Sequence, residues 1–202
     1  MAPRPYNMEK RQLTASETRT RILEAARQLL ASESETDLSM DAIASRADVS
    51  RLTIYYQFKS RTGLLEALYD YLAMRGNMQR MAEVFYETDG SIALHKLIRT
   101  FVGFWSSDPV VIRRLRAMAA LDSEIGKGIQ ERDRRRVQAS SEILRRMILR
   151  KREKPVITRN LAADVLTMLT SFETYDALAR AGHNENQIVA AITSLARFAS
   201  GL

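Results

Sequence analysis

The chain has 202 residues, of which 46% are hydrophobic, and it carries a formal net charge of +7. It holds eight glycines, four prolines and no cysteine, which favours one or two helical domains and excludes disulfide and thiol chemistry. No apolar run approaches the roughly 18 residues of a membrane span, and the N-terminal residues lack a signal-peptide segment. We therefore expect a cytoplasmic protein with no membrane partner.

The positive charge is unevenly distributed along the chain. Residues 96–154 hold 16 Lys and Arg against 7 Asp and Glu, whereas residues 1–75 hold 11 against 10. The net charge is therefore weak support for DNA binding by the N-terminal part. We interpret the basic middle segment first as a solvated helix face, with contact to flanking DNA or attraction of an anionic ligand as alternatives. The consecutive arginines 134–136 fan out around a helix, so they cannot all face one site.

The N-terminal part begins with a basic arm, residues 1–13, and a first helix. A capping box, Thr14-Ala-Ser-Glu17, predicts where that helix starts, because the Thr hydroxyl and the Glu carboxylate can each accept from a backbone N–H of the first turn. A polar connector at 32–37 follows, and Ser39 is then placed to cap a second helix.

Two short helices joined by a tight turn follow over residues 39–58. Ser50 is a natural N-cap for the second of them, Arg51 to Phe58. On a 3.6-residue wheel, Ile54 and Phe58 fall on one side, and polar and aromatic residues occupy the other. Two small helices arranged in this way are typical of a DNA-binding helix-turn-helix.

Six further helices are expected after the helix-turn-helix, giving an all-α chain of about nine helices. The first of them starts at Ser60 and continues to about residue 85, loosened at Gly76-Asn77. The eighth predicted helix extends from Thr158 to Ala181, with Gly182 at its stop position. The starts of the others are Ser91, Asp108-Pro109, Asp122 or Ser123, and Asn184, which opens an Asn-x-x-Gln capping box.

Three separated motifs resemble the TetR family of bacterial transcriptional regulators. They are T-R-x-x-I-L-x-A-A at 18–26, D-A-I-A at 41–44 and V-S-R-L-T-I-Y-Y-Q-F-K-S-R-x-x-L-L at 49–65. The resemblance covers roughly residues 14–70. It implies a helix-turn-helix DNA-binding domain over residues 1–60 and a larger helical ligand-sensing and dimerisation domain over residues 61–202.

The resemblance implies that the helix 51–58 approaches the major groove of a double-stranded DNA operator. Arg51 can donate two hydrogen bonds to guanine, and Tyr55 matches a phosphate-contacting tyrosine of the family. Tyr56 either reads a base or packs, and Gln57 replaces the histidine that is more usual in the family. The candidate DNA-binding residues are Ser39, Ser50, Arg51, Leu52, Thr53, Tyr55, Tyr56, Gln57, Lys59 and Arg61.

The resemblance also implies a homodimer paired through the predicted eighth and ninth helices. The alternative is that these helices form a central pair within one monomer, since the eighth carries two apolar faces. The candidate interface residues are Leu161, Val165, Leu169, Ile188, Ile192 and Leu195.

Family members usually bind a small ligand inside the C-terminal helices, so we expect an unidentified small-molecule ligand there. Side chains of this type are also common in plain core, so each candidate has that alternative. His95, Arg99, Glu173 and Asp176 are the candidate polar anchors. The candidate lining residues are Met74, Met78, Met81, Phe101, Phe104, Trp105, Met118, Met147, Phe172 and Tyr175.

Catalysis is poorly supported by the sequence. His95 and His183 are the only histidines, and neither has a partner at metal-ligand spacing. There is no glycine-rich phosphate loop and no nucleophile elbow, so we predict no enzyme activity, no metal and no cofactor. The resemblance to the TetR family implies a homodimeric repressor that a ligand releases from a (pseudo)palindromic operator. The alternatives are an activator of the same family, or a helical ligand-binding or interaction protein without operator binding.

Overall fold

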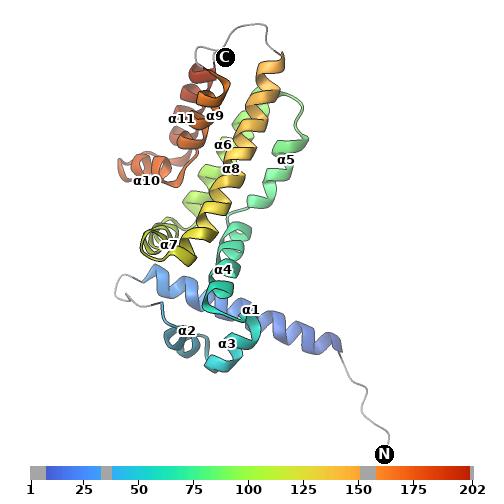
Figure 1. The fold of residues 1–202 in the computed structure, drawn as a ribbon, viewed down its shortest axis with the longest axis vertical. Helices are drawn as coiled ribbons and strands as arrows, with labels where there is room; N and C mark the ends of the chain where they lie inside the picture. The colour runs from blue at the N-terminus through green and yellow to red at the C-terminus, as the bar shows by residue number, and fades with distance from the viewer. Residues whose placement is uncertain (1–7, 33–37, 151–157, 201–202) are drawn as a thin grey trace, which may run out of the picture. The chain divides into compact units, whose positions relative to one another are not determined.

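The computed structural model describes residues 8–32, 38–150 and 158–200, and these residues form helices and no strand (Figure 1). The prediction of an all-α chain is confirmed. The contacts divide the chain into two compact units, residues 1–71 and residues 72–202. Helix α4 (Arg61–Arg75) crosses this boundary, whereas the sequence placed the end of the DNA-binding domain at the start of that helix.

Unit 1 contains α1 (Met8–Ala31), α2 (Met40–Ala47), α3 (Arg51–Phe58) and most of α4. The expected start of the first helix at Thr14 is wrong, because α1 already begins at Met8. The added residues, Met-Glu-Lys-Arg-Gln-Leu, all have high or moderate helix propensity, which favours extension over a capped start.

The turn between α2 and α3 has the geometry that its sequence predicts. Ser39 accepts from the Ala42 N–H at 3.2 Å, and Ser50 accepts from the Thr53 N–H at 3.0 Å, so both predicted caps are confirmed. Asp48 ends α2 in the left-handed conformation with φ of 49°. The Val49 N–H donates to the carbonyl oxygen of Ala44 at 3.1 Å and closes the end of α2. The chain then turns into α3.

The start of α4 is set by a glycine with no room for a side chain. Ser60 caps the helix, with its Oγ accepting from the Gly63 N–H at 2.9 Å. A Cβ at Gly63 would collide with the carbonyl oxygen of Phe58. In the sequence, Gly63 occupies the position where an acidic residue would complete a capping box. In the structure, the absence of a side chain lets the chain turn tightly from α3 into α4.

The predicted long fourth helix is broken in unit 2. Helix α4 ends at Arg75, Asn77 takes a left-handed conformation with φ of 57°, and a short 3-10 helix η1 (Met78–Arg80) leads into α5 (Met81–Tyr86). A Cβ at Gly76 would lie 2.5 Å from Cδ2 of Phe104 on α6 (Gly90–Ser107). The glycine therefore permits close backbone packing, in addition to marking the helix end.

The predicted eighth helix is also two helices, α9 (Arg159–Leu169) and α10 (Phe172–Arg180). Ser171 caps α10 by accepting from the Thr174 N–H at 3.2 Å, and the Thr170 hydroxyl bonds back to the Leu166 carbonyl at 2.8 Å. Local side-chain hydrogen bonds of this kind compete with a continuous helix. The described residues thus hold eleven α-helices and one 3-10 helix, where about nine helices were expected.

The remaining helices of unit 2 are α7 (Pro109–Leu121), α8 (Ser123–Arg150) and α11 (Glu185–Ser200). The capping box that opens α11 is confirmed, with two reciprocal 3.0 Å bonds between Asn184 and Gln187. Helices α6 and α8 pack on each other, and α9 and α11 lie against them (Figure 1). Leu97 of α6, Ile143 of α8 and Ile188 of α11 are fully buried in this core.

Substituting Gly76 by Ala should destabilise unit 2. The new methyl group meets Phe104 and the α6 backbone, and overpacking of this kind costs about 1–3 kcal/mol. Gly103→Ala is the matched control, because a Cβ there meets nothing within 4 Å and alanine favours a helix by up to about 1 kcal/mol. Denaturant unfolding followed by the fluorescence of Trp105, the only tryptophan, measures both. Equal stability of the two variants would contradict the close approach.

Candidate nucleic-acid interface and effector site

Helix α3 is positioned by one buried side and by an arginine of α1. Ile54 and Phe58 are buried, at 0% and 5% exposure. From α1, Arg19 donates to the carbonyl oxygen of Gln57 at 2.9 Å, and its guanidinium lies 4.3 Å from the centre of the Phe58 ring. These contacts fix the rotation of α3 about its own axis, and so determine which side chains face outward.

The outward side of α3 is apolar, aromatic and basic. Leu52 and Tyr56 are 77% and 75% exposed, and Arg51 and Tyr55 are exposed beside them. Such a surface, presented by a short rigid helix, suits insertion into a DNA groove.

Two of the predicted contact residues are partly turned inward. Gln57 is half-buried, and its side chain donates to the carbonyl oxygen of Ala15 at 3.4 Å. Thr53 is also half-buried, with its hydroxyl 2.8 Å from that of Ser50. These side chains organise the start and end of α3, and the sequence pattern does not distinguish that role from DNA contact.

Arg51 is preorganised by two neighbours. Its Nη1 lies 3.2 Å from an Asp41 carboxylate oxygen, and its Nη2 is 3.5 Å from the Tyr55 hydroxyl oxygen. The hydrogen bond to Tyr55, followed by the charge of Asp41, raises the pKa of Arg51 above its ordinary value. Asp41 therefore serves as an exposed partner that holds the arginine in place.

The remaining candidates lie around the ends of these helices. Lys59 follows α3 with φ of 68°, and its Nζ donates to the Tyr56 carbonyl at 3.1 Å and lies 5.2 Å from the centre of the Tyr56 ring. Arg61 is exposed at the first turn of α4, and Ser39 is the cap of α2. Helix starts carry backbone N–H groups that suit phosphate oxygens.

The end of unit 1 is tied back to α1 through a carboxylate. The Tyr71 hydroxyl donates to Glu24 at 2.8 Å, and Arg27 donates to the same carboxylate at 2.7 Å. The bond from Arg27 is the largest of several that lower the pKa of Glu24 to about 2, against a partial opposing effect of burial. This cluster links the connecting helix α4 to the helix that supports α3.

In unit 2, five of the ten candidate lining residues come together as an aromatic cluster. The ring centres of Phe104 and Trp105 are 4.6 Å apart, and those of Trp105 and Phe172 are 5.6 Å apart. Phe101 and Tyr175 extend the cluster at 6.3 Å on either side. The Trp105 indole N–H donates to a buried backbone carbonyl at 2.9 Å, so these rings are packed core.

The other candidates are scattered. Met78 and Met81 pack against the edge of the core, and Met118 is half-buried on α7. Met74 is 60% exposed, and the proposed polar anchors His95 and Arg99 are exposed on α6, so these three are not placed inside unit 2. The side chain of Met147 lies outside the described residues.

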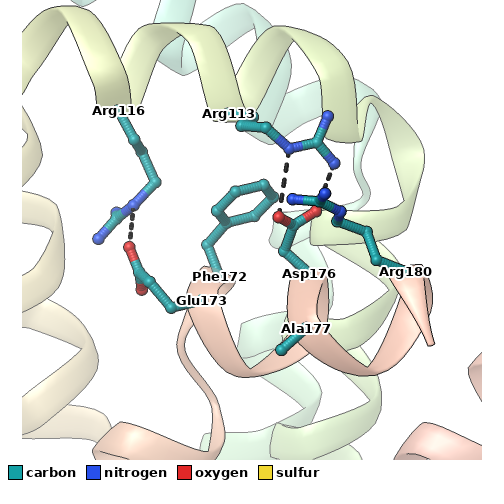
Figure 2. A pocket seen from close by; sticks show the side chains of 7 residues that line it. All are labelled: Arg113, Arg116, Phe172, Glu173, Asp176, Ala177 and Arg180. Carbon is teal, nitrogen blue, oxygen red and sulfur yellow. Dashed lines mark hydrogen bonds and ion pairs between the residues drawn. The ribbon is translucent and has the colours of Figure 1, made fainter.

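A recess of about 610 Å³ lies between α7 and α10 (Figure 2). Arg113 forms an ion pair with Asp176, and Arg116 donates to Glu173 at 2.7 Å across it. Its lining includes Phe172, which also belongs to the aromatic cluster. Among the predicted residues it contains Phe172, Glu173 and Asp176. Arg113 and Arg116 belong to the basic segment for which attraction of an anionic ligand was one alternative, whereas the sequence pattern did not indicate Ala177 and Arg180.

The candidate dimer residues fall into two groups. Leu169, Ile188 and Ile192 lie in the core of their own chain at 6%, 1% and 1% exposure, so their assignment to a surface interface is wrong. Their apolar pattern fits a core equally well, which is why periodicity alone did not separate the two roles. Leu161 and Leu195 are 49% and 54% exposed.

Helices α9 and α11 nevertheless each expose an apolar stripe. On α9 the stripe is Leu161, the half-buried Val165 and Met168, spaced i, i+4, i+7. On α11 the same spacing gives Ala191, Leu195 and Phe198, the last 74% exposed. Spacing of this kind places each stripe on one helix face.

Comparisons with known proteins agree with this architecture. The sequence model described as "Bacterial regulatory proteins, tetR family" matches residues 22–68, which span the helix-turn-helix. Residues 22–68 therefore carry the helix-turn-helix of the TetR family, a motif with which transcriptional regulators bind DNA. A search of curated proteins found no match.

Solved structures of transcriptional regulators share the fold of most of this chain. A TetR-family regulator from Syntrophomonas wolfei is 14% identical with a TM-score of 0.73, covering 93% of this chain and 96% of that one. A regulator from Saccharomonospora viridis in complex with choline is 20% identical at 0.70, covering 89% and 95%. NalD of Pseudomonas aeruginosa, a secondary repressor of a multidrug efflux pump, is 20% identical at 0.66, covering 91% and 95%.

The family and these neighbours are regulators and not enzymes. Within the ranges that the structure describes, no helix combines the length and the apolar character needed to cross a bilayer.

The Glu24 cluster should make unit 1 sensitive to acid. Because the folded pKa is about 2 against an ordinary 4.5, its contribution is full above pH 4.5 and is lost as the pH falls toward 2. Arg27→Gln should raise the Glu24 pKa toward 4.5, lower stability at pH 7 by about 1 kcal/mol and shrink the loss between pH 4.5 and 2.

Denaturation at pH 7 and pH 3, with NMR titration of the Glu24 carboxyl carbon, measures this effect. Arg21→Gln, at an exposed site on the same helix, is the control for removing one charge. An unchanged Glu24 pKa in Arg27→Gln would contradict the assignment.

Proposed function

We propose that this TetR-family regulator is a homodimeric repressor that binds a (pseudo)palindromic DNA operator and is released by a small-molecule ligand. The observation that carries the proposal is the outward side of α3, which presents Arg51, Tyr55 and Tyr56 from a helix locked on α1. One fold neighbour, NalD, is a repressor, and another neighbour is a complex with choline. Both support the regulatory part of the proposal by analogy.

In this proposal, Arg51 is the main residue that recognises bases of the operator. Its guanidinium is held by exposed partners, so it can exchange Asp41 for a guanine edge at little cost. Lys59 and Arg61, at the junction of α3 and α4, supply charge for phosphates, which positions the helix without specifying sequence.

Arg51→Ala should weaken operator binding by about 1–3 kcal/mol and relax base preference. Lys59→Ala should weaken all DNA sequences more evenly and reduce the salt slope by about one unit. Fluorescence anisotropy with the DNA upstream of the chain's own gene, at two salt concentrations and against scrambled DNA, separates the two effects. Unchanged affinity and preference in Arg51→Ala would remove the base-reading role.

Pairing is proposed to occur through the exposed stripes of α9 and α11, because these apolar faces are not covered by the described part of the chain. An operator with two half-sites requires two recognition helices about 34–36 Å apart or a multiple of that distance. A two-fold pair of chains supplies them, and its interface would be the same surface on both copies.

Leu195→Asp should dissociate the dimer without unfolding the chain, because the side chain is exposed within one copy. Ala190→Asp is the matched control: it adds the same charge to an exposed position about 140° away around α11. Light scattering gives the mass, and circular dichroism gives the fold. Ile192→Asp would unfold the core instead and does not test the interface. A Leu195→Asp chain that keeps a dimer mass would exclude this stripe.

Release by a ligand is proposed to act through contacts that lead from the recess to α4. Phe172 on the recess packs on Trp105, Trp105 packs on Phe104, and Phe104 abuts the backbone of Gly76 at the end of α4. A ligand that favours one arrangement of these rings favours one position of the α4 end. Operator and ligand would then weaken each other's binding by the same factor.

A further inference from the structure

Arg136 is a buried cation in the middle of α8. It is 7% exposed, whereas its neighbours Arg134 and Arg135 are exposed on the outside of the same helix. Its Nη2 lies 3.4 Å from a carboxylate oxygen of Asp133. Its Nε and Nη1, which together carry three N–H groups, have no hydrogen-bond partner among the described residues.

Ser140, one helical turn further along α8, also has a buried polar group without a hydrogen-bond partner among the described residues. It is 0% exposed, and its hydroxyl has no hydrogen-bond partner in the described part of the chain. Residues four apart lie on one face of a helix, so Arg136 and Ser140 offer their donors on the same inward side of α8. Buried donors without partners cost free energy, which makes a purely structural role for this pair unfavourable.

The buried arginine does not line the recess, but one carboxylate connects it to a residue that does. Arg116, which lines the recess, approaches Asp133 at 3.4 Å, and Asp133 is the ion-pair partner of Arg136. Burial lowers the pKa of Arg136, the charge of Asp133 opposes this, and the charges of Arg116 and Glu173 also act on it. An arginine keeps its charge under such conditions.

We propose that the ligand of this regulator is an organic carboxylate, whose carboxylate group is bound by Arg136 and Ser140 and whose apolar part contacts Phe172. The inference rests on the proposed function and names the chemical class of its ligand. Glu173 is the exposed half of its ion pair with Arg116, so opening that pair to admit the ligand costs little.

The charges favour a monoanion. The recess and the Arg136–Asp133 pair together hold four arginines, Arg113, Arg116, Arg136 and Arg180, and three carboxylates, those of Asp133, Glu173 and Asp176. The surplus is a single positive charge, which matches a carboxylate better than a phosphate dianion. The planar fork of a guanidinium also fits the two oxygens of a carboxylate. The apolar lining by Phe172 favours an aliphatic or aromatic body over a small inorganic anion.

Trp105 supplies the test signal, since its ring lies 5.6 Å from that of Phe172 and it is the only tryptophan. The full chain is titrated with octanoate, phenylacetate, their methyl esters and inorganic phosphate, up to millimolar concentrations. At least one carboxylate should change the fluorescence saturably, and its methyl ester should bind roughly tenfold more weakly or worse because the charged hydrogen bonds are lost.

Three variants assign the effect to residues. Arg136→Met should weaken carboxylate binding roughly tenfold or more, Ser140→Ala should weaken it less, and Arg135→Met, an exposed neighbour with the same charge change, should leave it unchanged. Without ligand, Arg136→Met should keep or raise the melting temperature, because an apolar side chain replaces unpartnered donors and Asp133 retains Arg116.

The proposal is overturned if no carboxylate binds, if esters bind as well as acids, if phosphate binds more tightly than both acids, or if Arg136→Met binds like the wild type. A large loss of melting temperature in Arg136→Met would make the residue structural and also contradict it. Operator binding by ligand-free wild-type protein is measured separately. If the wild-type protein binds the operator but no carboxylate, only this inference is refuted. If it does not bind the operator, the proposed function itself is refuted.

Discussion

The proposed recognition helix α3 has only eight residues, so the direction in which its side chains point depends on how it packs in unit 1. A helix of that length is not stable alone in water, so its position is set by burial of Ile54 and Phe58 and by Arg19 from α1. The same contacts decide that Arg51 and Tyr56 face outward. At the other end, Gly63 lets α4 begin at Arg61, with only Lys59 and Ser60 between it and the end of α3.

Local signals in the sequence predicted much of this arrangement. Ser39, Ser50 and Ser60 each cap the helix that they precede, and Asn184 with Gln187 forms the expected capping box. These signals succeed because a cap is formed by residues three positions apart and needs no knowledge of the rest of the fold. The capping box at Thr14 is the exception, since α1 continues through it from Met8. The bounds of the two helices in the helix-turn-helix were therefore predictable, whereas the inward turn of Thr53 and Gln57 was not.

Features that depend on distant residues were not predictable. The break at Gly76 depends on Phe104. The break between α9 and α10 involves Trp105, whose indole N–H donates to the backbone carbonyl of Thr170. Leu169, Ile188 and Ile192 show the apolar period of an interface, but neighbours elsewhere in the chain bury them. In the same way, the run of arginines from residue 134 reads as a solvated face, although helix geometry turns its last member inward. Sequence periodicity reports which face is apolar, and only the packed structure reports what covers it.

The account centres on α3 as a base-reading helix used twice in a symmetric complex. Selection of binding sites from random-sequence DNA by the wild-type chain, followed by footprinting of the enriched sequences, tests this most directly. The account predicts enrichment of an inverted repeat, with two protected half-sites whose centres are separated by one helical turn or a multiple of it. Enrichment of no sequence at low salt, or of a single unrepeated half-site protected by one copy, would contradict it.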